Sequence, residues 1–419
     1  MPRRGMISTP IVLRPNRRLR LDPRDPVFFN DPYAAYAAIH ARSAAFFWED
    51  YGHWCFAGFD QVNALLRDRR FGRQILHVAS REELGLPEPA RHLARFDAVE
   101  AHSLLELEPP AHTRLRTLVN RAFVSRSIER LRPEIEVLCE RLIDGFDADG
   151  EVELLASFAE IVPATIIARM LGVPEDRTAD LLDWSHRMVK MYMFGRDLSV
   201  EEDADLAAGE FADFLREIIG ERRAEPRDDL ISHMIAAQAA GEDRLSEAEL
   251  ISTAVLLLNA GHEATVHQIG NAVPSILASG LAPSALFADA GTTSRTIEEC
   301  LRHDAPLHMV TRYALDDVVL PGDIAIRRGD RIGLMLGAAN RDPARFAEPD
   351  RFDPSRADQG HVSFGAGIHF CIGAPLARLE LEIALPALFR RLPRLRTTKA
   401  PRYRDAYHFH GLEALHLCW

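Results

Sequence analysis

Helical periodicity dominates the pattern of hydrophobic and polar positions along this chain. Apolar residues recur three and four positions apart in several segments, which places them on one face of a helix: 133–143, 158–171 and 205–223. Strand-like stretches are few and short: 46–56, 310–319, 323–328 and 331–336. The pattern therefore predicts a mainly α protein with small β-sheets.

The longest predicted helix begins at residue 247 and reaches about residue 273. Ser246 and Glu249 are spaced as a capping box at its start, and Pro274 is expected to end or kink it. The first half is apolar on almost every side, which is typical of a helix at the centre of a protein. Its middle turns nevertheless carry a group of residues suited to chemistry: Gly261, His262, Glu263 and Thr265. Polar groups at a buried position need a partner or a function.

The composition of the chain favours a soluble globular protein and argues against some functions. The chain is 47% hydrophobic and 27% charged, as in a soluble globular protein. Its net charge of -12 argues against general binding of nucleic acid. The N-terminal segment has no apolar run long enough for a signal sequence or a membrane span, so we expect a cytoplasmic protein. We expect a basic N-terminal arm over residues 1–24 and one large domain over residues 25–419.

A glycine-rich stretch, "SFGAGIHFCIGAPLA" at 363–377, carries one of five scattered cysteines. It does not match a dinucleotide loop, because Phe370 occupies the place of the third glycine. A predicted helix starts directly after Cys371, so the positive end of that helix can face the sulfur and lower the pKa of the thiol. A thiolate held by backbone N–H groups is suited to bind haem iron. The alternative is a small buried cysteine in a tight turn.

Five motifs in the same order resemble those of the cytochrome P-450 family. The pattern Phe364-Gly365-x-Gly367-x-His369-x-Cys371-x-Gly373 is similar to the family's haem-binding signature. Four more segments resemble, in turn, its C-helix, its oxygen-activation segment, its Glu-x-x-Arg element and its meander: 108–123, 260–265, Glu299–Arg302 and 340–356. The chain is identified as a member of the soluble bacterial type, which implies the P-450 fold with its long central helix over the haem.

The resemblance also implies a cofactor and the residues that hold it. One haem b is expected, with Cys371 as the axial thiolate and metal ligand. Phe364, Gly365 and Gly373 shape the loop around the sulfur. The haem propionates are expected to meet a set of donor side chains: His112, Arg116, Arg312 and His369. For the arginines, the alternative is an ordinary solvated side chain.

The central helix departs from the family's pattern at one position. Members usually carry an acid followed by an alcohol that route protons, whereas this chain has Glu263 followed by Ala264. Thr265 lies about 100° further round the helix and cannot simply replace the missing hydroxyl. Gly261 permits a local opening of the helix. Three explanations stay open: a substrate hydroxyl, as in some macrolide-hydroxylating relatives; chemistry less dependent on this relay; or waters held by Glu263 and Thr265.

The activity that the resemblance implies is monooxygenation, in bacterial secondary metabolism, of a mainly apolar small organic molecule. Residues proposed to line the pocket are Met188, Met191–Phe194, His308 and His408. The alternatives are that the first group belongs to the helix core and that the two histidines are structural. Electrons would come from a separate ferredoxin and its NAD(P)H-dependent reductase, which would dock on a monomer near Arg114, Arg121 and Arg378. The alternatives are peroxide-driven or non-hydroxylating chemistry, such as coupling, dehydration or isomerisation, and a non-catalytic haem protein that binds a ligand.

Overall fold

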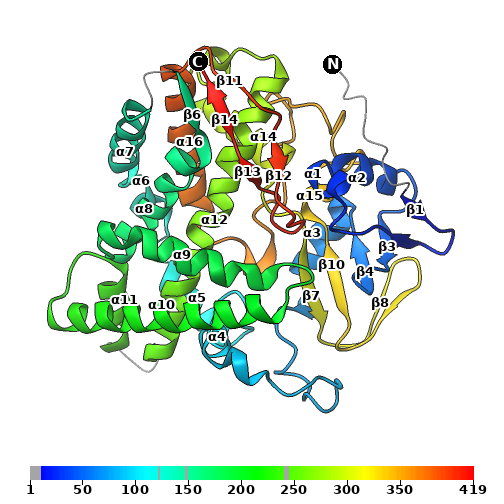
Figure 1. Ribbon diagram of the computed structural model, residues 1–419. Helices are drawn as coiled ribbons and strands as arrows, with labels where there is room; N and C mark the ends of the chain where they lie inside the picture. The colour runs from blue at the N-terminus through cyan, green and yellow to red at the C-terminus, as the bar shows by residue number, and fades with distance from the viewer. Residues whose placement is uncertain (1–10, 121–122, 147–149, 240–244) are drawn as a thin grey trace.

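A computed structural model describes residues 11–120, 123–146, 150–239 and 245–419. Helices make up most of it, and the strands gather mainly at one side (Figure 1). The mainly α prediction is therefore confirmed. Each predicted strand-like stretch contains strands, but 46–56 holds two, Ala45–Trp48 and His53–Phe56, and 310–319 also spans two, Val310–Ala314 and most of Val318–Leu320. The described α-helices are α1 Pro26–Asn30, α2 Tyr33–His40, α3 Phe59–Arg67, α4 Ala94–Glu100, α5 Ala111–Asn120, α6 Ser125–Glu129, α7 Arg132–Asp144, α8 Ile161–Leu171, α9 Thr178–Val189, α10 Leu198–Ala224, α11 Leu230–Ala239, α12 Glu247–Ser279, α13 Pro283–Leu286, α14 Ala290–His303, α15 Leu336–Ala339 and α16 Ala374–Arg391.

The strands form four sheets among the described residues. The largest has the order β1-β2-β3-β4-β10-β7-β5, and the smaller ones are β11-β14-β6, β12-β13 and β8-β9. The strand bounds are β1 Val12–Leu13, β2 Arg18–Arg20, β3 Ala45–Trp48, β4 His53–Phe56, β5 Phe71–Gly72, β6 Glu151–Glu153, β7 Val310–Ala314, β8 Val318–Leu320, β9 Ile324–Ile326, β10 Arg331–Leu334, β11 Arg396–Thr397, β12 Arg402–Tyr403, β13 Leu412–Ala414 and β14 His416–Cys418.

The N-terminal segment is not a separate arm as far as the structure describes it. Strand β2 pairs in parallel with β3, with Leu19 opposite Trp48, and Leu19 and Leu21 are buried. The expected boundary at residue 24 is therefore wrong, because these leucines gain apolar contacts that a solvated arm would forgo. Residues 1–10 lie outside the described residues.

Helix α12 lies in the centre of the molecule, as predicted, and packs against α8, α9, α10, α14 and α16. Its capping box is present: Ser246 accepts a hydrogen bond from the Glu249 backbone N–H, and Glu249 reaches back to the Ser246 N–H. The helix continues past Pro274 to Ser279, so the predicted end near residue 273 is wrong. Burial of Ile276 in the main core favours the extra turn, and Gly280, with φ of +72°, ends the helix.

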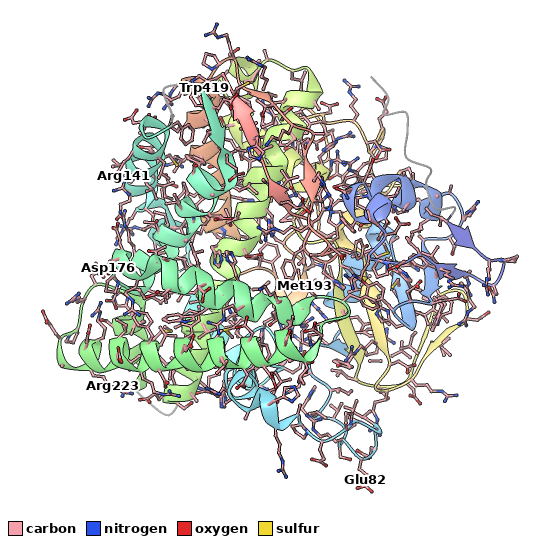
Figure 2. All side chains as sticks on the ribbon, viewed as in Figure 1. Glu82, Arg141, Asp176, Met193, Arg223 and Trp419 are labelled. Carbon is pink, nitrogen blue, oxygen red and sulfur yellow. The ribbon has the colours of Figure 1, made fainter. Side chains whose placement is uncertain are left out.

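Helices α9 and α10 lie side by side and cross the central helix (Figure 1). Side chains fill the spaces between these ribbons, and Met193 lies in the segment that joins α9 to α10 (Figure 2). Met188 and Met191 are buried in the main core, whereas Tyr192, Met193 and Phe194 are exposed. The apolar cluster expected at a pocket is therefore divided between core and surface.

A buried ion-pair network ties helix α14 to the segment before the cysteine loop. Arg302 donates two hydrogen bonds to Glu299, of 2.7 and 2.8 Å. Arg302 also donates to the Asn340 carbonyl at 2.8 Å, and Arg356 donates to Glu299 at 3.3 Å. The side chains of both members of the Glu299–Arg302 pair have no exposed area. The pair is thus part of the interior and not a surface ion pair, and the meander segment completes its network as expected.

Candidate haem-thiolate site

The glycine-rich loop folds back on itself directly before helix α16. Gly365 and Gly367 have φ of +68° and +72°, a backbone conformation that residues with a Cβ rarely adopt. A Cβ on Gly367 would also lie 2.4 Å from the carbonyl oxygen of Leu66. The backbone N–H of Cys371 donates to the carbonyl of Phe364 at 2.9 Å. Glycine is therefore required for this loop to hold the cysteine in place.

The surroundings of the sulfur have two opposite effects on the pKa of the Cys371 thiol. Burial raises the pKa of Cys371, whereas the backbone N–H groups of Gly373 and Ala374 and the charges of Arg116 and Arg378 lower it. The helix end thus faces the sulfur as predicted. The net direction differs from the expected one, because burial outweighs these donors and raises the pKa of the free thiol. A bound metal ion would compensate, since a coordinated thiol is deprotonated.

The four predicted propionate donors lie close to the loop. His112 on α5 and His369 in a short 3-10 helix have ring centroids 4.5 Å apart. Arg116, one turn after His112 on α5, donates to the carbonyl of Phe370. Arg312 on β7 is buried and donates to the Thr311 carbonyl at 2.9 Å. Neither arginine is an ordinary solvated side chain.

Two members of this cluster were not predicted from the sequence. The Arg73 guanidinium donates to the Thr311 carbonyl at 3.2 Å, beside Arg312. Glu108 accepts from the backbone N–H of Arg73 at 2.6 Å and lies 3.4 Å from His369 Nε2. Glu108 is the first residue of the predicted C-helix motif, which is a signal for it. Arg73 lies in no motif.

The cluster fits a group that carries two carboxylates. Both ring nitrogens of His112 and the Nε of Arg73 are buried and have no hydrogen-bond partner. Burial and the charge of Arg73 lower the pKa of Arg312 to about 10. An anion at this position would satisfy the free donors and offset the repulsion between the arginines. The residues present therefore fit the propionate edge of haem.

On the central helix, Glu263 is surrounded by three histidines and an arginine. Its Oε1 lies 3.1 Å from His267 Nε2 and 3.7 Å from Arg404 Nη1. Its Oε2 lies 3.6 Å from both His262 Nε2 and His186 Nε2. Burial raises the pKa of Glu263, but the histidines outweigh burial and lower it to about 2. The carboxylate is therefore ionised at neutral pH.

One face of α12 is accessible in its middle turns. Ala260 is exposed, and Leu256 and Ala264, one turn to either side, are half-buried. Thr265 is buried at 5% exposure, which agrees with the expectation that its hydroxyl does not occupy the place beside Ala264. The helix is continuous at Gly261, so the local opening that this glycine permits is not present. A Cβ on Gly261 would lie 2.9 Å from Ile167 Cγ1 on α8, which makes this glycine a close-packing position.

Comparisons with known proteins agree with this geometry. The family model described as cytochrome P-450 matches residues 77–275 and 289–400. Cytochrome P-450 107B1 of Saccharopolyspora erythraea is 39% identical over 86% of this chain and 88% of its own length. The polyketide biosynthesis cytochrome P-450 PksS of Bacillus subtilis is 34% identical over 95% and 98%. The crystal structure of P450BioI, in complex with an acyl carrier protein ligated to hexadec-9Z-enoic acid, has a TM-score of 0.86. It is 32% identical and covers 94% of this chain and 100% of that one.

The chain belongs to the cytochrome P-450 family. It is an oxidoreductase of the monooxygenase type, and its cofactor is haem b with an axial cysteine thiolate. No helix among the described residues of this P-450 has the length and apolar composition needed to cross a membrane.

Several other predicted residues of the P-450 are engaged within the protein. His308 has no exposed area and its Nδ1 lies 2.7 Å from the Tyr36 hydroxyl, so it belongs to the core and does not contact a substrate. His408 is half-buried, with its ring near Tyr51 and Tyr407. These contacts give His308 a structural role.

The basic residues expected at a partner surface are also engaged. Arg114 donates to Glu249. Arg378 donates to Glu298 at 2.6 and 3.0 Å, and its guanidinium lies 4.5 Å from the centroid of the Phe364 ring. Arg121 lies outside the described residues. The described positions alone do not present unpaired charges for a ferredoxin.

Proposed function

We propose that Cys371 is the axial ligand of the haem and that this P-450 inserts one oxygen atom from O₂ into an apolar small organic molecule. When bound, the haem activates O₂ and supplies the oxidising chemistry. Cys371 is the residue that the loop is built around, and this observation carries the proposal. Gly365 and Gly367 supply the backbone turns, while Gly373 and Ala374 direct N–H groups at the sulfur. Phe364 packs beside the loop and is held by Arg378.

The residues of the propionate cluster bind and orient the cofactor. His112 offers two buried ring nitrogens and Arg73 a buried Nε that have no hydrogen-bond partner, while the other Arg73 nitrogens donate to Glu106 and to the Thr311 carbonyl. Arg312, Arg116 and His369 add positive charge or further N–H groups. Charge-assisted hydrogen bonds of this kind are the stronger ones in proteins. Glu108 positions His369 and the Arg73 backbone.

We assign to Glu263 a role in the delivery of protons during the reaction. Its ionised Oε2 lies 3.6 Å from His186 Nε2, and the His186 side chain is 38% exposed, so this histidine connects the carboxylate to solvent. His267 and Arg404 hold the other oxygen, Oε1, and so orient the carboxylate. Ala264 offers no hydroxyl to pass the proton onward. We infer that a hydroxyl of the substrate, with waters held near Glu263, completes this step.

The substrate class is a mainly apolar molecule of moderate size that carries a hydroxyl group, such as a polyketide-derived compound. Support comes from the relative named for polyketide biosynthesis and from the missing alcohol at position 264. Electrons come from a ferredoxin and its NAD(P)H-dependent reductase. We further propose that the enzyme acts as a monomer in the cytoplasm.

A titration of the ferric protein tests the proposal. The purified holoprotein is mixed with hydroxylated polyketides, terpenoids, steroids and aromatic compounds while the Soret band is followed. A shift towards high spin identifies the substrate class, and product mass then shows whether one oxygen atom was added. The matched variant Cys371→Ser should lose the thiolate signature of the reduced carbon monoxide complex, while Cys139→Ser should keep it. Retention of that signature in Cys371→Ser would exclude this ligand.

A further inference from the structure

Glu263 shares its buried position with two imidazoles that come from different elements. His262 precedes it on α12, and His186 lies on α9, which crosses the central helix (Figure 1). One ligand atom from each of the three residues lies within 4.8 Å of the other two. The imidazole nitrogens each lie 3.6 Å from the same carboxylate oxygen, Oε2. These contacts are too long for direct hydrogen bonds.

The orientation of His262 determines which of its nitrogens is available. Its Nδ1 lies 2.8 Å from the backbone carbonyl of Leu258. A carbonyl oxygen only accepts, so Nδ1 carries the proton and donates it. In the neutral ring Nε2 then holds a lone pair. That lone pair is buried, has no hydrogen-bond partner and faces the lone pairs of Glu263 Oε2. Two acceptors that face each other at 3.6 Å repel, and a cation bound between them would remove that repulsion.

The carboxylate is fixed in the same way. His267 and Arg404 engage Oε1 at 3.1 and 3.7 Å, which leaves Oε2 directed at the two imidazoles. Outer partners of this kind commonly orient the ligands of a metal ion. The positive charge of Arg404 is on the far oxygen, so it does not lie between the three ligand atoms.

We propose that His186, His262 and Glu263 form a binding site for a transition-metal cation of the Zn²⁺ class. Two imidazole nitrogens and one carboxylate oxygen are a ligand set that Zn²⁺ takes, with the fourth position left to water. Tetrahedral bonds of about 2.0–2.2 Å place ligand atoms about 3.4 Å apart, so the two 3.6 Å contacts to Glu263 Oε2 need little change. The two imidazole nitrogens, which lie within 4.8 Å of each other, would close on the ion. His186 has a side chain that is 38% exposed, and it gives the ion a route from solvent.

A bound cation would also regulate the enzyme, and this part rests on the proposed function. Glu263 Oε2 would be occupied as a metal ligand and could not take part in the proton delivery proposed above. Proton delivery would slow while substrate binding at the haem stayed intact. The site would thus make monooxygenation sensitive to zinc.

Calorimetric titration of the haem-loaded protein with zinc chloride tests the site without any turnover. We expect one Zn²⁺ per chain. Affinity should fall by more than about tenfold in His186→Ala and in Glu263→Gln, the loss that removing even an outer partner of a ligand can cause. The Soret band and circular dichroism verify folding of each variant. His92→Ala is the matched control, because His92 is also half-exposed and paired with a glutamate, Glu201, at 2.8 Å.

The outcomes separate the two parts of the proposal. Absence of zinc binding by the wild type, or equal affinity in His186→Ala, would overturn the site. If zinc binds but product formation is as fast as without it, the regulatory part is wrong and the site stands. His186→Ala lacks one ligand of the proposed site. If zinc still slows product formation by this variant, assayed with the same ferredoxin and reductase, zinc acts on those partners. A protein that binds zinc but adds no oxygen to any substrate would contradict the proposed function and not the metal site.

Discussion

The side-chain amide of Asn340 donates a hydrogen bond of 2.7 Å to the Ser363 hydroxyl at the start of the cysteine loop. Asn340 Oδ1 accepts from the backbone N–H of Val362 at 2.9 Å, and its own carbonyl accepts from Arg302. Ser363 in turn donates to the Leu301 carbonyl at 2.7 Å. One buried asparagine therefore connects the Glu299–Arg302 pair to the loop that presents Cys371.

Asn340→Ala should loosen that connection. It leaves the Val362 N–H without its acceptor in the interior, which costs about 1–3 kcal/mol of unfolding free energy. Urea unfolding and the rate of haem loss to an acceptor protein measure the two effects. Asn63→Ala, at a half-buried surface position, is the control and should change stability by less than about 0.5 kcal/mol. Unchanged haem retention in Asn340→Ala would contradict the connection.

Gly261→Ala should destabilise the protein even though alanine favours helices. The new Cβ would meet Ile167 Cγ1 at 2.9 Å, and overpacking costs about 1–3 kcal/mol, against a gain in helix propensity of about 1 kcal/mol. Gly220→Ala is the matched control, since it lies in helix α10 with nothing within 4 Å of its Cβ. That variant should be more stable than the wild type. Denaturant unfolding of the two variants shows whether each change raises or lowers the unfolding free energy relative to the wild type. A Gly261→Ala variant more stable than the wild type would contradict close packing at this position.

Ala264→Thr tests the missing hydroxyl. With a substrate analogue that lacks its own hydroxyl, peroxide release per oxygen consumed should fall several-fold, because the threonine can pass a proton. Ala264→Val adds the same volume without the hydroxyl and should not reduce the leak. Oxygen uptake, peroxide and product are measured together. Equal behaviour of the two variants would leave the substrate-hydroxyl explanation without support.

Stability below neutral pH should depend on Glu298. Burial raises its pKa, but hydrogen bonds from His361 and Arg378 outweigh burial and lower it from 4.5 to about 2. Because the folded pKa is the lower one, the stabilisation is present above pH 4.5 and is lost as pH falls towards 2. The whole contribution is about 3 kcal/mol.

Glu298→Gln should remove this dependence. Unfolding free energies of the wild type and the variant, measured in denaturant between about pH 6 and pH 3, should differ less as the pH falls. The exposed Glu202→Gln is the control, and its curve should run parallel to that of the wild type. Parallel curves for Glu298→Gln would show that the carboxylate is not stabilised by folding.

The sequence by itself determined the features that depend on neighbours along the chain. The capping box at Ser246 and the helix that it starts follow from local spacing, and so do the glycines that hold the loop before Cys371. The pairing of Glu299 with Arg302 is also local, because residues three apart share a helix face. Interactions of this kind join residues a few positions apart, so they can be predicted from the sequence.

Only the tertiary structure brought distant residues together. Arg73 meets Thr311 beside Arg312, and His186 reaches Glu263, through contacts between separate elements that no spacing in the sequence encodes. Packing in the folded protein also outweighed preferences that the local sequence predicts. Helix α12 passes Pro274 because the turn beyond it is buried, and the basic N-terminal segment joins a sheet because Leu19 and Leu21 gain a core. Burial raises the pKa of Cys371 against the local helix end. In each case the free energy of burial, which depends on the whole fold, exceeds a local preference.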